Sequence, residues 1–212
     1  MSDSELTMAA HGAGHGAALE ESPYGMQSKK LAMWLFIASD AVTFAVALVA
    51  YGYLRIGSPD WTRPFNFWPS IANGLVMTFV LLSSSLTMLV AVRAAKAGDK
   101  HKSIQWIGFT MLLGIIFAGL HLREWFHMFA DGWGLFHNPT GGSIDFGAAF
   151  FSVTGLHLLH VTSGVVALAV IAWGYNRGRL DQNHVETTSL YWHFVDIVWM
   201  FVFPLMYLMN AH

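Results

Sequence analysis

The chain has 212 residues, of which 55% are hydrophobic and 11% are charged, and its formal net charge is -2. A typical globular protein has about 25% charged residues, so this composition excludes an ordinary soluble domain and indicates a membrane protein. The chain contains no cysteine, which excludes disulfides, iron–sulfur clusters and haem attached through a Cys-x-x-Cys-His motif. The near-neutral charge and the scattered basic residues exclude nucleic acid as an expected partner.

The chain is expected to divide into a tail and one membrane domain. Residues 1–28 are rich in Gly, Ala, Ser, Glu and His without hydrophobic periodicity, which predicts a disordered cytoplasmic tail. They lack the basic start and apolar core of a cleaved signal peptide. Residues 29–212 are predicted to be all-α, a bundle of five transmembrane helices, because each apolar stretch is long enough to span hydrocarbon. The five stretches are approximately 31–53, 68–92, 104–127, 146–173 and 188–209.

The basic residues predict the orientation of the chain, since Lys and Arg near the ends of spans stay on the cytoplasmic side. Most of them fall on the side of the N-terminal tail. This predicts a cytoplasmic N-terminus and, after five crossings, a periplasmic or external C-terminus. The tail side holds Lys29, Lys30, Arg93, Lys96, Lys100, Lys102, Arg177 and Arg179, whereas the opposite side holds Arg55, Arg63 and Arg123.

Polar and ionisable residues inside the predicted spans are the candidate functional residues, because unpaired charges in hydrocarbon are costly. Three spans each carry a pair at positions i and i+3, which share one helix face. The first span adds a single carboxylate that has no basic residue within a helical turn. These seven residues are His121 with Glu124, His157 with His160, His193 with Asp196, and Asp40.

The depth of these residues predicts two polar layers. With a rise of about 1.5 Å per residue, Asp40 and Asp196 lie roughly 12 to 14 Å from the cytoplasmic side. His121, His157 and His160 lie nearer the external side, roughly 20 to 26 Å in. Asp40 is expected to be neutral or to share a proton with a polar neighbour, since it lacks a cation. His193 and Asp196 are expected to pair with each other or to bond to a neighbouring helix.

The imidazole layer leaves a haem-binding membrane anchor as one alternative, with His121, His157 and His160 as the candidate ligands. A di-iron carboxylate site needs two Glu-x-x-His motifs and two further glutamates. The chain offers one such motif, from Glu124 to His127, and no second intramembrane glutamate. The tail residues His11 and His15 are expected to be solvated. A proton-coupled transporter is disfavoured because the sequence shows no inverted repeat.

Four motifs in one order resemble a known family, subunit III of the haem-copper oxidases. Residues 191–201, YWHFVDIVWMF, resemble its Trp-His-Phe-Val-Asp-Val-Val-Trp type of run, and residues 151–164, FSVTGLHLLHVTSG, resemble its Thr/Gly-x-His-x-x-His-Val-x-x-Gly signature. Residues 35–40, LFIASD, and the stretch from LGIIF at 113–117 to Glu124 are similar to its two other motifs. The resemblance covers residues from about 29 to the C-terminus. It matches the last five helices of the seven-helix members, as do short bacterial forms, and Asp40 replaces the usual glutamate.

The resemblance implies an accessory, non-redox subunit of a proton-pumping terminal oxidase that reduces oxygen to water in the bacterial inner membrane. It implies direct packing on subunit I, association with subunit II and membrane lipids, and a place in a larger respiratory supercomplex. The haems and copper would belong to the partner subunits, so we expect no catalytic, cofactor-binding or metal-ligating residue here, while bound phospholipid is expected. Cytochrome c is the expected electron donor of the complex, and ubiquinol, as in bo-type oxidases, is the alternative.

Overall fold

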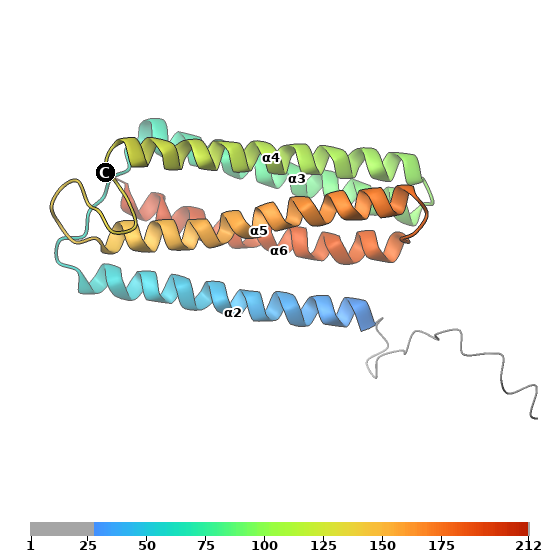
Figure 1. Ribbon diagram of the computed structural model, residues 1–212, viewed down its shortest axis with the longest axis horizontal. Helices are drawn as coiled ribbons and strands as arrows, with labels where there is room; N and C mark the ends of the chain where they lie inside the picture. Colours follow the sequence, from blue (N-terminus) through green and yellow to red (C-terminus); the bar gives the residue numbers. More distant parts are fainter. Residues whose placement is uncertain (1–27, 212) are drawn as a thin grey trace, which may run out of the picture.

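A computed structural model describes residues 28–211, and the predicted tail before Ser28 lies outside the described residues. Five long helices run side by side in an elongated bundle (Figure 1). All five are long and apolar enough to cross a membrane, which confirms the prediction of an all-α protein with five spans. They are α2 Ser28–Gly57, α3 Ala72–Lys96, α4 Lys100–Ala130, α5 Asp145–Asn176 and α6 Gln182–Met206; a π-helical segment, Phe67–Ile71, precedes α3, and a 3-10 turn, Leu208–Asn210, follows α6.

Most of the helices extend beyond the apolar stretches that predicted them, because polar residues cap their ends. The α6 helix begins at Gln182, ahead of the predicted start at 188, since the Asp181 carboxylate accepts a hydrogen bond from the His184 amide. The α4 helix begins at Lys100, where Asp99 accepts from the Lys102 amide at 3.0 Å. Such caps satisfy amides that have no partner within the helix. The hydrophobic pattern therefore locates the spans but not the helix ends.

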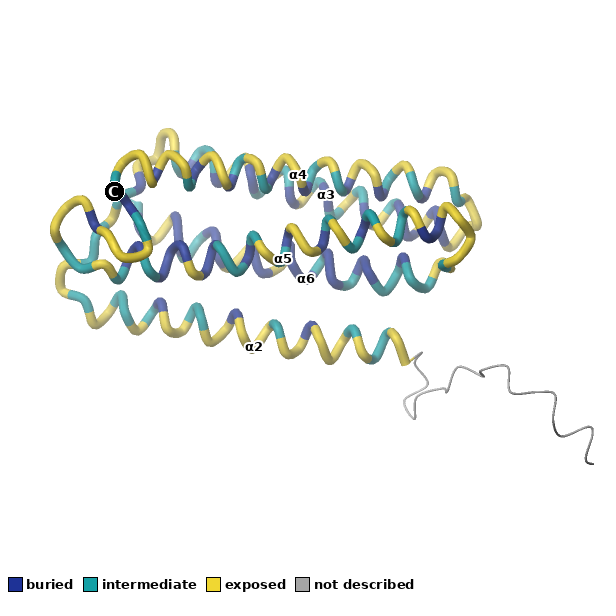
Figure 2. Tube along the Cα trace, in the orientation of Figure 1, coloured by how far each residue is buried: buried dark blue, intermediate teal, exposed yellow. Residues whose placement is uncertain are grey.

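Four of the helices form a closed ring, and the fifth packs on its outside. Contacts join α3 to α4, α4 to α5, α5 to α6 and α6 back to α3, whereas the main contacts of α2 are with α5 and α6 (Figure 1). The apolar part of α6 is 56% buried and that of α2 is 11% buried, and the same contrast is visible along the chain (Figure 2). The α6 helix is therefore the centre of the fold, and α2 leaves most of its surface to the membrane.

The ring of Trp192 packs directly against two glycines, Gly114 and Gly164. The ring of Trp192 is almost completely buried, and a Cβ atom at Gly114 of α4 would lie 2.6 Å from it. A Cβ atom at Gly164 of α5 would lie 3.0 Å from the same ring. The indole Nε1–H donates to the Ser84 hydroxyl of α3 at 3.0 Å. One α6 side chain thus joins three neighbouring helices, as expected where small residues let helices approach in lipid.

Polar contacts near both ends hold α2 against the ring. At its start, Lys30 forms an ion pair with Glu186 of α6 at 2.9 Å. Near its end, the Tyr51 hydroxyl donates to the Leu205 carbonyl at 2.8 Å and accepts from the Asn210 amide at 2.9 Å. Arg55 donates to the Met209 carbonyl at 2.7 Å. These bonds compensate for the limited apolar burial of α2.

Candidate functional site

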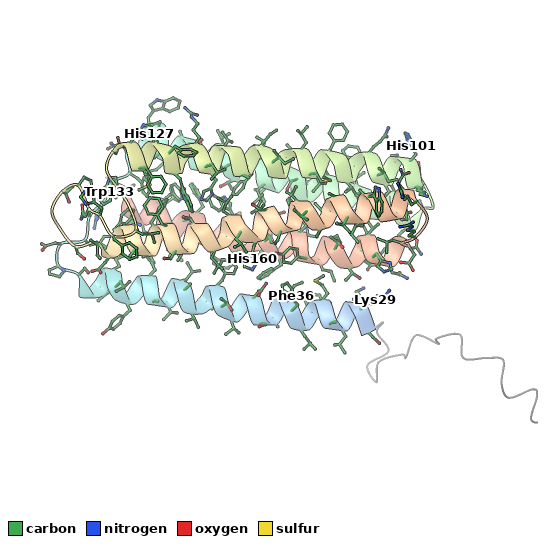
Figure 3. The ribbon with its side chains drawn as sticks, viewed as in Figure 1. Lys29, Phe36, His101, His127, Trp133 and His160 are labelled. Carbon is green, nitrogen blue, oxygen red and sulfur yellow. The ribbon has the colours of Figure 1, made fainter. Side chains whose placement is uncertain are left out.

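Among residues 28–211, one carboxylate contacts an imidazole inside the spans: Asp40 of α2 lies against His160 of α5. The distance from Asp40 Oδ2 to His160 Nε2 is 3.2 Å, and both side chains are largely buried. His160 lies between α5 and α2, midway along the bundle (Figure 3). This contact gives Asp40 a polar neighbour, whereas its protonation state stays a prediction.

The other ring nitrogen of His160 determines where protons can lie. His160 Nδ1 is 2.8 Å from the Leu156 carbonyl oxygen, and a carbonyl can only accept, so Nδ1 carries a proton. The contact between Nε2 and Asp40 then needs one further proton, placed on either atom. In both arrangements the pair is electrically neutral as a whole. Neutrality is what makes such a pair tolerable in hydrocarbon, where an isolated charge is costly.

The predicted separation into an acidic layer and an imidazole layer is wrong for His160. Its contact with Asp40 places these two residues at the same depth. On the predicted cytoplasmic side α2 and α5 each extend three residues beyond the apolar stretch, to Ser28 and Asn176, so the observed helix ends leave the difference in position along the two helices unchanged. Neighbouring helices project unequally beyond the hydrocarbon, so depth counted along one helix does not transfer to the next.

His121 and His157 lie in the middle of the ring, packed around Trp199 of α6. Both imidazoles are fully buried, and their ring centres lie 5.6 and 5.1 Å from that of Trp199. Phe117 also contacts both rings, at 5.7 Å in each case. Within residues 28–211 the structure gives neither imidazole a hydrogen-bond partner. Their aromatic contacts come from α4 and α6, and Phe44 of α2 adds one to His157 at 6.4 Å.

Glu124 and His127 do not converge, although they form a Glu-x-x-His motif in sequence. Glu124 Oε2 accepts a hydrogen bond from the Asn73 amide of α3 at 2.8 Å. His127 instead contacts Asp131, one turn further along, at 3.1 Å on the exposed surface. The two side chains therefore serve an interhelical contact and a helix end, respectively.

His193 bonds to a neighbouring helix and forms no ion pair with Asp196. The distance from His193 Nδ1 to the Ser85 hydroxyl of α3 is 2.6 Å. Both oxygens of Asp196 are buried, and the Ser85 hydroxyl that contacts His193 also lies beside the Asp196 carboxyl group. Of the two arrangements expected from the sequence, the structure thus supports the bond to a neighbouring helix for His193.

A charged cluster at one end of the bundle was not anticipated from the sequence. Glu186 of α6 forms ion pairs with Lys30 of α2 and Lys96 of α3, at 2.9 and 3.1 Å. Beside it, burial would raise the pKa of Asp181, but hydrogen bonds from His184 outweigh this effect and hold that pKa below its usual value of 3.8. The signal that could have found the cluster is Asp181 itself, a capping residue type that moves the start of α6 ahead of Glu186.

A groove on the outer surface separates α2 from α6 and begins next to the Asp40–His160 contact. It encloses about 260 Å³. Its walls are apolar, with Ala41, Phe44, Ala45 and Leu48 from α2 and Phe194, Ile197, Val198 and Phe201 from α6. This geometry suits a hydrocarbon chain and offers no polar group for a headgroup.

In the described residues, the three candidate haem ligands are either enclosed by aromatic rings or engaged by other partners. Bis-imidazole ligation needs the haem plane between two imidazoles, yet Phe117 and Trp199 occupy the space around His121 and His157. Both nitrogens of His160 are engaged, by Asp40 and by the Leu156 carbonyl. Over residues 28–211, no three His, Asp or Glu side chains are grouped so that they could hold a metal ion.

Comparison with known proteins identifies the family of the chain. Residues 15–211 match the family described as cytochrome c oxidase subunit III. The chain is 38% identical over 184 residues to "Cytochrome bo(3) ubiquinol oxidase subunit 3" of Pseudomonas aeruginosa, covering 84% of this chain and 83% of the relative. It is 31% identical to "Cytochrome c oxidase subunit 3" of Alkalihalophilus pseudofirmus, covering 87% and 88%. It is also 31% identical to "Probable quinol oxidase subunit 3" of Staphylococcus aureus, covering 85% and 89%. The chain therefore belongs to the cytochrome c oxidase subunit III family of the haem-copper oxidases.

Proposed function

We propose that this chain is a non-redox subunit of its oxidase, with the haems and copper held by partner subunits. The observation that carries the proposal is how the three candidate haem ligands are used. Aromatic rings enclose His121 and His157, and His160 is bound by Asp40 and a backbone carbonyl. The chain then contributes packing, bound lipid and support of proton uptake rather than electron transfer.

The proposed partners are the catalytic subunit I, through direct packing, and subunit II. Most of the exposed surface of α2 is apolar, with Val42, Val46 and Val49 each more than 60% exposed. Such a surface is compatible with either lipid or a neighbouring subunit, since both offer apolar contacts in the membrane. The apolar groove between α2 and α6 supports the expected association with lipid chains.

The proposed location is the bacterial cytoplasmic membrane, with the start of α2 on the cytoplasmic side. The start of α2 and the α3–α4 and α5–α6 turns lie at one end of the bundle (Figure 1), which is called the basic end below. Lys29 and His101 lie at this end, whereas His127 and Trp133 lie at the opposite end (Figure 3). Basic residues concentrate at cytoplasmic ends of membrane proteins. The C-terminus would then be periplasmic or external.

The test of the non-redox proposal is removal of the chain from the assembled oxidase. We expect haem absorbance and copper content per catalytic subunit to stay unchanged, and the initial rate of oxygen reduction to stay largely intact. The isolated full-length chain should show no Soret absorbance after purification with added haem. Haem loss in proportion to the missing chain would favour the haem-anchor alternative instead.

The electron donor of the complex is a separate question. The relatives include subunits of a cytochrome c oxidase and of quinol oxidases, and the higher identity is to the bo(3) ubiquinol oxidase subunit. This favours the quinol alternative, whereas the preference for cytochrome c from sequence alone stays a prediction. Oxygen uptake by the purified complex with reduced cytochrome c, compared with a soluble ubiquinol, distinguishes the two.

A further inference from the structure

Most basic side chains at the basic end have a partner within the chain. Anionic or aromatic groups of the bundle engage them, either through ion pairs and hydrogen bonds or through contacts with ring faces. These partners are Glu186 for Lys30 and Lys96, His184 for Lys29, the Tyr175 ring for Lys100, and the Trp173 ring for Arg177 and Arg179.

Arg93 and Lys102 differ from this pattern. For neither side chain does the structure of residues 28–211 show an ion pair, a side-chain hydrogen bond or an aromatic contact. Both line one pocket of about 230 Å³, between the last turns of α3 and the first turn of α4. The remaining walls are Val90, Ala94, Ala97 and Asp99. Two otherwise unused cations therefore face one concave site.

The charge of the pocket limits what it can hold. Asp99 also lines it, and this carboxylate caps α4 by accepting from the Lys102 amide at 3.0 Å. The guanidinium, the ammonium and the carboxylate together carry a single net positive charge. A phosphodiester carries a single negative charge, and guanidinium and ammonium groups are its usual partners.

An apolar surface continues from the pocket toward the middle of the bundle. Leu86 precedes Arg93 by two helical turns on α3, and Phe109 follows Lys102 by two turns on α4, so each lies on the same helix face as its cation. Both side chains are more than half exposed. Trp106 contacts Phe109 and lies on α4 between Lys102 and Phe109. Aromatic residues are common at this position, where a membrane protein meets the interface between lipid and water. The site thus joins a basic pocket to a lipid-facing apolar surface.

We propose that this pocket binds the headgroup of an anionic phospholipid, with the phosphate between Arg93 and Lys102 and an acyl chain along Leu86 and Phe109. The charge of the pocket selects the phosphate, and the adjoining apolar surface selects a lipid over free phosphate. The site is independent of the electron donor and of the redox role of the chain. It also lies on a different pair of helices from the groove between α2 and α6.

The test uses the full-length chain in detergent and native mass spectrometry with added dioleoylphosphatidylglycerol. The double variant R93Q/K102Q should bind this lipid roughly 10- to 30-fold more weakly, since each basic residue near a membrane surface contributes about 1 kcal/mol. The control R177Q/R179Q removes the same charge from the same end but from side chains that stack on Trp173. It should keep the affinity of the parent chain.

A gain-of-affinity variant keeps the proposal testable if R93Q/K102Q fails to fold. Asp99→Asn preserves a capping side chain while raising the net charge of the pocket, so phosphatidylglycerol should bind more tightly. Dioleoylphosphatidylcholine should bind more weakly than phosphatidylglycerol to the parent chain. The proposal is overturned by equal losses in both double variants, by no loss in R93Q/K102Q, or by equal binding of the two lipids. Displacement of phosphatidylglycerol by millimolar inorganic phosphate would contradict a lipid site and indicate a simple anion site.

Discussion

His160 of α5 and Asp40 of α2 hold one proton between them, at a distance of 3.2 Å from Nε2 to Oδ2. The proton count follows from the Leu156 carbonyl, which obliges His160 Nδ1 to be a donor. The pair is neutral wherever that proton lies. It joins the loosely packed α2 to the ring of helices at mid-membrane, where α2 has few other polar contacts.

The pair should behave as one unit in a double-mutant cycle. Asp40→Leu leaves Nε2 of His160 without a partner in an apolar environment, which should destabilise the chain by about 1–3 kcal/mol. Asp40→Asn keeps a hydrogen-bond donor and should cost less. Combining Asp40→Leu with His160→Leu should recover part of the loss. The measurement is the midpoint of thermal unfolding in detergent, and strictly additive effects of the two leucine substitutions would contradict the pairing.

A hydrophobic carbodiimide should label Asp40 in preference to Asp196. The Asp40 side chain is 17% exposed at the outer surface, whereas both Asp196 oxygens are fully enclosed by the bundle. The reagent dissolves in lipid and reacts with a protonated carboxyl group that it can reach. Peptide mapping by mass spectrometry identifies the modified residue. Labelling restricted to loop carboxylates such as Asp99, or found first on Asp196, would be inconsistent with this geometry.

Gly114→Ala should destabilise the bundle, whereas Gly108→Ala on the same helix should not. A Cβ atom at Gly114 would lie 2.6 Å from the Trp192 ring, and one at Gly108 would meet nothing within 4 Å. Overpacking of this kind costs about 1–3 kcal/mol, while an unobstructed Gly-to-Ala change in a helix gains up to about 1 kcal/mol. Unfolding midpoints of the two variants provide the comparison. Equal midpoints would show that Trp192 can move aside.

The start of α6 should lose order in acid through Asp181. The folded-state pKa of Asp181 lies below its usual value of 3.8, so its stabilising effect is present above 3.8 and disappears as the pH falls through the lower, folded-state value. Hydrogen–deuterium exchange of the peptide around His184 should therefore accelerate, relative to the intrinsic rate, only below pH 3.8. Asp181→Asn, which caps without titrating, should remove this pH dependence. If exchange still accelerates at low pH in this variant, a group other than Asp181 causes the acid sensitivity.

The sequence predicts the spans well because hydrophobic length is a property of each segment by itself. Apolar runs located all five helices, and basic residues predicted which turns share an end of the bundle. Contacts between helices are different, since they depend on rotation and relative height. The predicted depth of His160 was wrong for this reason. For the same reason, neither segment alone could identify Ser85 as the partner of His193.

Helix capping explains a second group of features that the sequence did not predict, namely the helix starts and the contacts made there. Asp181 starts α6 ahead of the apolar stretch and brings Glu186 into contact with Lys30 and Lys96. The hydropathy pattern places Glu186, Lys30 and Lys96 outside the spans, although they form the charged contact that joins α6, α2 and α3. The candidate site is affected similarly, because an i, i+3 pair fixes a shared face but not the neighbouring helix that the face meets. Asn73 next to Glu124 is one such neighbour.

A non-redox subunit that sustains the catalytic one is tested most directly by oxygen consumption of the oxidase purified with and without this chain. Haem is quantified by absorbance beforehand, and traces are recorded at mildly acidic and mildly alkaline pH. We expect equal haem content and similar initial rates, and we expect the activity of the depleted complex to decay during turnover, faster at alkaline pH where protons are scarce. Steady turnover of the depleted complex at both pH values, or haem loss in proportion to the missing chain, would contradict this expectation.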